Sequence, residues 1–128
     1  MHPKFSPSPP PSEKAILDFT TSLRKQLPSD YLSAMAFANG GTGFVGNRYV
    51  KLWPVEKLLE LNNAYQIQKY CPNLFAIGSH GGGETYVFDL AKSDGAIYRI
   101  PLVGMEPAET EFVSPSFDTF VPRANFLR

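Results

Sequence analysis

The sequence has little cysteine: Cys71 is the only one among its 128 residues. A single thiol cannot form an internal disulfide, nor does it provide the paired cysteines of a structural zinc site. A chain of this length buries roughly two-thirds of the surface that it exposes when unfolded, so it can fold around one core without such links. We therefore expect one domain in a reducing compartment, the cytoplasm, with Cys71 as a small buried apolar residue.

An excess of charge of either sign is also absent, because twelve lysines and arginines balance twelve aspartates and glutamates. Proteins that bind nucleic acids draw much of their affinity from basic side chains on phosphates. The charge balance therefore argues against a nucleic-acid partner. The imidazole and thiol ligands are His2, His80 and Cys71, and no two have the spacing of a metal site. We expect neither a metal nor a cofactor.

Long apolar runs are missing as well. No segment approaches the ~18 consecutive apolar residues of a membrane-spanning helix. The N-terminal residues lack the basic start and apolar stretch of a secretory signal. We expect no membrane partner and no export.

Proline is concentrated at the start of the chain, where residues 1–11 hold five of its twelve prolines. Proline has no amide donor and a fixed φ, so this stretch is predicted to be an extended, poorly packed, flexible arm. A proline-rich motif that binds a partner is the alternative interpretation. We place the folded domain at residues 12–128.

Helical patterns follow this arm. Ser12 is a suitable N-cap for a first helix, and Pro28 ends its pattern and starts a second helix. Asn39-Gly40-Gly41 ends the second helix, because these residues tolerate the left-handed conformation. Pro54 starts a third helix, predicted to reach about Tyr70. The apolar face predicted for the first helix comprises Ala15, Ile16, Phe19, Leu23 and Leu27.

Strand patterns dominate the second half of the chain. Two short strands at 43–46 and 48–53 flank a turn at Asn47. Helices first and hairpins later predict a single-domain α+β fold, with an antiparallel or mixed sheet and helices packed mainly on one side. The later strands are predicted at 74–78, 85–89, 96–100 and 111–113, before a short helix at 117–121.

Four short motifs occur in order between residues 27 and 121. A Leu-Pro-x-acidic-Tyr start and an Asn-Gly-Gly end bracket the second helix, and a Trp-Pro pair precedes the third. A glycine-rich turn followed by an acidic residue joins two strands, and a Ser-Phe-x-x-Phe helix closes the set. This ordered set resembles the SUKH superfamily, whose best-known branch contains the yeast cell-wall assembly regulators. The motif residues, interpreted as structural, are Leu27, Pro28, Tyr31, Asn39, Gly40, Gly41, Trp53, Pro54, Gly78, Gly81, Gly82, Gly83, Ser116, Phe117 and Phe120.

The resemblance implies a role as well as a fold. Most bacterial members of the superfamily look like immunity proteins encoded beside polymorphic toxins, and a minority resemble housekeeping regulators or scaffolds. It therefore implies a monomeric or weakly dimeric protein that binds a toxin domain encoded nearby, with a regulatory or scaffold module as the alternative. Immunity proteins against nucleases and deaminases are often acidic. This chain is neutral, which leaves the class of toxin open.

The glycine-rich turn also carries the strongest hint of chemistry. Ser79, His80 and Glu84 supply a nucleophile, a base and an acid within six residues. Catalytic triads normally come from separate segments, and the Ser-containing elbow leads from a strand into a helix, whereas a strand follows here. We therefore predict no catalytic residues and no enzyme. The glycines could also cradle a phosphate, but no helix start or Lys-Ser/Thr pair follows them.

A contact surface is the remaining candidate site. Trp53 and Phe44 are assigned to the core, while residues near turns are expected to face solvent in part. Tyrosine and arginine are enriched at the energetic centres of protein interfaces. The predicted partner-binding residues are Asn47, Arg48, Tyr49, His80, Glu84 and Tyr86.

Overall fold

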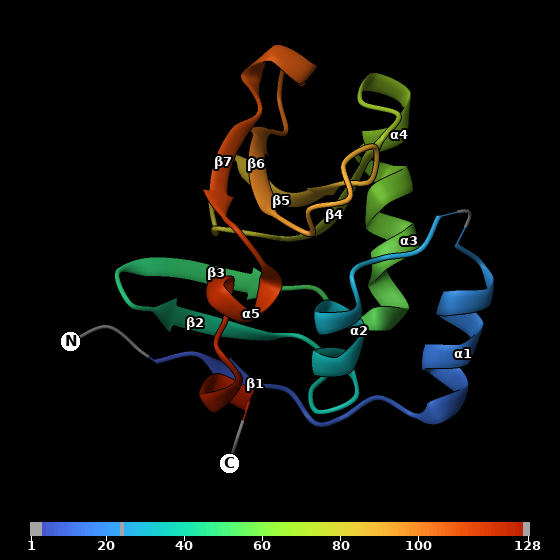
Figure 1. Cartoon of the computed structure of the whole chain (residues 1–128), viewed down its shortest axis with the longest axis vertical. Coiled ribbons are helices and arrows are strands. Elements are labelled where there is room, and N and C mark those ends of the chain that lie inside the picture. The colour runs from blue at the N-terminus through green and yellow to red at the C-terminus, as the bar shows by residue number, and fades with distance from the viewer. Residues whose placement is uncertain (1–3, 24, 127–128) are drawn as a thin grey trace.

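The computed structural model describes residues 4–23 and 25–126. Within them the chain forms the predicted α+β domain, a curled antiparallel sheet of seven strands with five α-helices (Figure 1). The strands lie across the sheet in chain order. They are β1 Ser6–Pro7, β2 Gly41–Val45, β3 Arg48–Leu52, β4 Leu74–Ser79, β5 Glu84–Asp89, β6 Ile97–Pro101 and β7 Glu111–Ser114. The helices are α1 Glu13–Thr21, α2 Ser29–Met35, α3 Val55–Ala64, α4 Ile67–Tyr70 and α5 Phe117–Phe120, with 3-10 turns η1 Pro107–Glu109 and η2 Arg123–Phe126.

The proline-rich start differs from the predicted poorly packed arm. It is extended, but β1 pairs with β2, so a strand precedes the two N-terminal helices. Phe5 is buried, and its ring lies 5.6 Å from that of Phe126. The apolar ring and the open edge of β2 therefore draw this part of the arm onto the domain. Residues 1–3 lie outside the described residues.

Helix α1 is shorter than its apolar pattern. Ser12 caps it as predicted, with its hydroxyl accepting from the amide of Ala15 at 3.1 Å. The helix ends at Thr21, where hydroxyl groups donate back to backbone carbonyls of the last turn. Leu23 and Leu27 therefore lie in the connection to α2, although Leu27 is still buried.

Aromatic side chains join the helices to one face of the sheet. Phe88 and Phe75 are partners across β5 and β4, so their side chains share that face. Helix α1 contributes one ring to it, and α2 and α5 contribute more. The ring pairs are Phe19–Phe75, Tyr31–Phe88, Tyr31–Phe117 and Tyr86–Phe120, with centroids 4.7 to 6.1 Å apart.

Side-chain amides hydrogen-bond to the backbone groups of strand β4 that β3 does not reach. Strand β3 pairs with β4 only near the end of β4, so Ala76 has no strand partner on that side. Asn62 of α3 takes this place, because its amide accepts from the Ala76 amide and donates to the Ala76 carbonyl, both at 2.9 Å. Gln68 donates to the carbonyl of Leu74 at 2.7 Å. Helix α3 is thereby tied to the sheet by hydrogen bonds as well as by apolar contacts.

The third helix does not run unbroken to Tyr70 as predicted. It stops at Ala64, and Gln66 adopts the left-handed conformation with φ 56° before α4 begins. The break turns the chain so that Ile67 is fully buried. Burial of this side chain offsets the strain at Gln66.

We expect Gln66→Gly to raise the free energy of unfolding by about 0.5–1 kcal/mol. A residue with a Cβ loses about 1–2 kcal/mol in the left-handed region, and the greater entropy of unfolded glycine cancels part of the gain. Urea unfolding measures the difference. Gln66→Ala retains the strain and serves as the control, so an equal gain in both variants would contradict this explanation.

Candidate functional site

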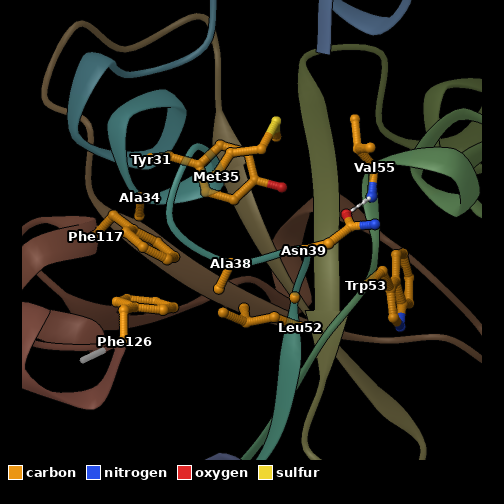
Figure 2. Close-up of a pocket in the computed structure, with 11 residues that line it drawn as sticks. Tyr31, Ala34, Met35, Ala38, Asn39, Leu52, Trp53, Val55, Phe117 and Phe126 are labelled. Carbon is orange, nitrogen blue, oxygen red and sulfur yellow. Dashed lines mark hydrogen bonds between the residues drawn. The ribbon is translucent and has the colours of Figure 1, made fainter. Parts of the chain in front are cut away.

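Residues of the first and last motifs meet around a small, partly open pocket of about 20 Å³. In Figure 2, Tyr31 and Met35 of α2 lie on one side of it, with Phe117 and Phe126 from the end of the chain beside them. A cavity of this size has room for about one water molecule. The motif residues around this pocket therefore pack against one another and leave no space for a ligand at this point.

Asn39 of the Asn-Gly-Gly motif caps a distant helix. Its side-chain oxygen accepts from the amide of Val55 at 2.7 Å (Figure 2). Its side-chain nitrogen donates to Glu56 at 2.7 Å. Helix α3 needs this partner because its own N-cap, Pro54, has no side-chain acceptor. The next residue, Gly40, has φ +77°, and a Cβ there would lie 2.4 Å from a carbonyl oxygen of β3.

The acidic residue of the first motif joins two helices. One oxygen of Asp30 accepts from the amide of Tyr31 at 2.8 Å, and the other accepts from the amide of Asp118 at 3.1 Å. Ser116 caps the same helix, α5, by accepting from the amide of Thr119. The opening and closing motifs are therefore linked directly, which accounts for their polar residues as parts of the scaffold.

Burial at this junction makes stability sensitive to alkaline pH. Burial raises the pKa of the Tyr31 phenol above the ordinary value near 10. The unfolded chain therefore ionises first, and the stability present below about pH 10 is lost as the pH rises above it. We expect Tyr31→Phe to show a smaller alkaline decline in the free energy of unfolding between about pH 9 and 11. Tyr70→Phe, at an exposed ring, is the control and should decline like the unmodified protein.

The predicted partner-binding residues gather where the glycine turn meets strand β3. His80 begins the turn between β4 and β5, and Glu84 ends it. The backbone of Gly81 lies against the ring of Tyr49. Arg48 follows the exposed β2–β3 turn at Asn47, and its guanidinium lies 5.7 Å from the centre of the Phe120 ring. The structure thus assembles a partly exposed surface from separate strands.

Tyr86 is the exception among these six residues, because it is only 2% exposed. Its ring lies 4.7 Å from that of Phe120, and its hydroxyl donates to the carbonyl of Tyr49 at 3.0 Å. Burial raises the pKa of this phenol, against the opposing effect of Arg48 and Arg99. Tyr86 therefore supports the surface from beneath, and the expectation that it contacts a partner is corrected: alternation along β5 placed it on the face that α5 covers.

Hydrogen bonds engage both ring nitrogens of His80. Its Nδ1 accepts from the amide of Gly82 at 2.9 Å, so that nitrogen carries no proton. Its Nε2 lies 3.1 Å from a carboxylate oxygen of Glu84 and therefore donates to it. Both ring nitrogens of His80 are therefore engaged in holding the turn.

This arrangement does not form a catalytic triad. A general base must hydrogen-bond to the nucleophile whose proton it takes. The nitrogens of His80 bond to Gly82 and Glu84, while the hydroxyl of Ser79 accepts from the amide of Gly81 at 3.5 Å. The amides of Gly81 and Gly82, which a phosphate would need, are thus engaged within the turn.

Two charged residues next to the predicted partner-binding residues, Arg99 and Glu111, were not predicted from the sequence. Arg99 of β6 lies 3.9 Å from Glu84 and donates to Glu111 of β7 at 2.9 Å. These contacts extend the His80–Glu84 pair across the sheet as a row of alternating charges. The pairing of β6 with β7 places Arg99 opposite Glu111. The sequence does not give this register, because the register is known only once the two strands are paired.

Other chemical groups do not assemble into a site. Cys71 is buried, as expected, and burial raises the pKa of its thiol. Among the residues the structure describes, no three histidine, cysteine, aspartate or glutamate side chains are grouped to hold a metal ion. In the same part of the chain, every helix is too short or too polar to cross a membrane.

The comparison with protein families agrees with the motif positions. The model of the SMI1 / KNR4 family (SUKH-1) matches residues 10–123, which is most of the chain and includes all four motifs. The chain belongs to this family. No curated protein matches it significantly.

Most of the described structure lies inside the residues that match the SUKH-1 family, and a small part lies outside them. The α-helices α1 to α5 and strands β2 to β7 lie within the match, whereas β1 precedes it and most of η2 follows it. The contacts of Phe5 with η2 thus lie at the border of the family region, and the capped helices and the glycine turn lie inside it.

Proposed function

We propose that this SUKH-1 protein acts by binding another protein, without catalysis, and that it is an immunity protein for a toxin encoded nearby. The observation that carries the proposal is the engagement of His80, whose two nitrogens bond to Gly82 and Glu84. The residue best suited to proton transfer thus serves to hold a loop in shape. Family membership is consistent with such a module.

The proposed contact surface combines aromatic and charged groups. Tyr49, Arg48, His80 and Glu84 are partly exposed, and Asn47 is exposed beside them. Rigid rings and charged groups held in place bind a partner with little loss of conformational freedom. Inhibition would then follow from covering the active face of the toxin, with charge complementarity guiding the encounter.

A housekeeping regulator or scaffold is the second candidate. It is favoured by the match to the SMI1 / KNR4 family itself. Such a protein would use the same surface for an endogenous partner or for a second copy of itself.

Co-expression with the product of the adjacent gene distinguishes the two candidates. Immunity predicts that this chain relieves the toxicity of that product and co-purifies with it. A harmless or non-binding neighbour would overturn the immunity proposal and favour the regulator.

Matched variants test the surface within the same assay. Tyr49→Ala is expected to weaken the complex by about tenfold or more, as for an aromatic residue at the centre of an interface. Tyr70→Ala removes an exposed ring on α4 and should leave the complex unchanged. Circular dichroism checks that both variants remain folded.

A further inference from the structure

In the described structure, two parts of the sheet that lack a neighbouring strand, the outer edge of β1 and the free part of β4, are protected against the addition of another strand. Strand β1 is short, contains Pro7, and lies under η2 through the contact of Phe5 with Phe126. The free part of β4 is covered by the amides of Asn62 and Gln68. Proline, short strands and covering groups are the usual protection of sheet edges against added strands.

Among the described residues, strand β7 is less protected than these stretches, although it is only four residues long and its pairing with β6 shifts register between Ile97 and Tyr98. It is the last strand of the sheet, and it lies on the outside of the molecule in Figure 1. Its four residues include neither proline nor lysine. Phe112 is 62% exposed, and its ring makes an edge contact with Tyr98 at 5.9 Å. An open edge that carries an exposed aromatic ring is a template for strand addition.

The charges around β7 indicate what kind of strand would fit. Glu106, Glu109 and Glu111 are all exposed in the six-residue stretch that leads into the strand. Two basic groups of the described residues lie near this stretch, and both already have partners. Arg99 is bound to Glu111 at 2.9 Å and lies 3.9 Å from Glu84, and Lys92, which lines a pocket with Pro107 and Thr110, donates to the hydroxyl of Tyr98 at 3.2 Å. The edge therefore offers carboxylates and an apolar ring, which complement an extended segment with alternating basic and apolar residues.

We propose that β7 is a docking edge for an extended basic segment of a partner protein, which adds to the sheet as a further strand and places an apolar side chain against Phe112. The proposal rests on the proposed function in protein binding. The row from Glu84 through Arg99 to Glu111 makes this edge continuous with the surface around His80. One partner can thus contact both.

Amide hydrogen exchange with two synthetic peptides tests the docking edge. One pentapeptide alternates lysine with valine, and its counterpart alternates glutamate with valine. The lysine peptide is expected to slow exchange several-fold at the amides of residues 111–114, and the glutamate peptide to have no effect there. Phe112→Ser should abolish the protection. Leu17→Ser, at an apolar residue of α1 that is equally exposed at 61%, should retain it.

Several results would overturn the proposal. Unchanged exchange in β7, equal protection by both peptides, or equal loss in the two serine variants each contradicts it. Protection that rises with protein concentration in the absence of peptide would assign the edge to a second copy of the chain.

The partner assay separates this inference from the proposed function. If the neighbouring gene product binds Phe112→Ser as tightly as the unmodified protein, the docking edge is wrong while immunity stands. If that product does not bind but the lysine peptide protects β7, immunity falls and the docking edge stands.

Discussion

Asn62→Leu is expected to lower the free energy of unfolding by about 4 kcal/mol. Asn62 is 2% exposed, and its amide bonds to both backbone groups of Ala76, which is fully buried. Leucine has a similar size but offers no hydrogen bond, so the amide and carbonyl of Ala76 would remain buried without partners. Each unsatisfied group costs about 1–3 kcal/mol.

Urea denaturation measures this loss, and the next residue provides the control. Asn63→Leu introduces the same side chain at an exposed position of the same helix and should change stability by no more than about 0.5 kcal/mol. A loss below about 1 kcal/mol for Asn62→Leu would mean that water or a shifted strand replaces the amide.

Gly78→Ala is expected to destabilise the protein by about 3 kcal/mol. A Cβ at Gly78 would lie 2.3 Å from the carbonyl oxygen of Lys51, which belongs to the paired strand β3. The methyl group fits only if the two strands separate, and overpacking of this kind costs about 1–3 kcal/mol or more. The pairing of β3 with β4 joins strands β1 to β3 to strands β4 to β7.

Gly83→Ala is the matched control for this substitution. No atom lies within 4 Å of a Cβ built at Gly83, and its φ is not in the left-handed region. The change should be neutral or stabilising by up to about 1 kcal/mol, because alanine restricts the unfolded chain. Thermal unfolding of the two variants compares them. An equal loss in both would show that steric contact at Gly78 is not the cause.

Local patterns were sufficient to predict most of the elements. The strands predicted at 74–78 and 85–89 are present as β4 and β5, because branched and aromatic residues fill both faces of a buried strand. Pro28 and Pro54 directly precede α2 and α3 as expected. The prediction failed at Gln66 and at Phe5, where burial of apolar side chains outweighed the local preference for an unbroken helix and a free arm.

The motif positions were predictable from the sequence, but their physical roles were not. Asn39 bonds to Val55, 16 residues away, and Asp30 bonds to Asp118, 88 residues away. Hydrogen bonds between such distant residues leave no periodic signal. Their geometry exists only after α2, α3 and α5 have packed together.

The sequence alone determined the α+β class, the order of most elements and the family motifs, because these depend on hydrophobic period, turn residues and capping residues. It also placed His80, Glu84 and Tyr49 near a common surface. The tertiary structure decided which of these side chains are exposed, how Arg99 joins them, and which edge of the sheet stays open. Alternation along a strand shows which residues share a face. Which face the helices cover, and which edge they leave free, follows from packing over the whole chain.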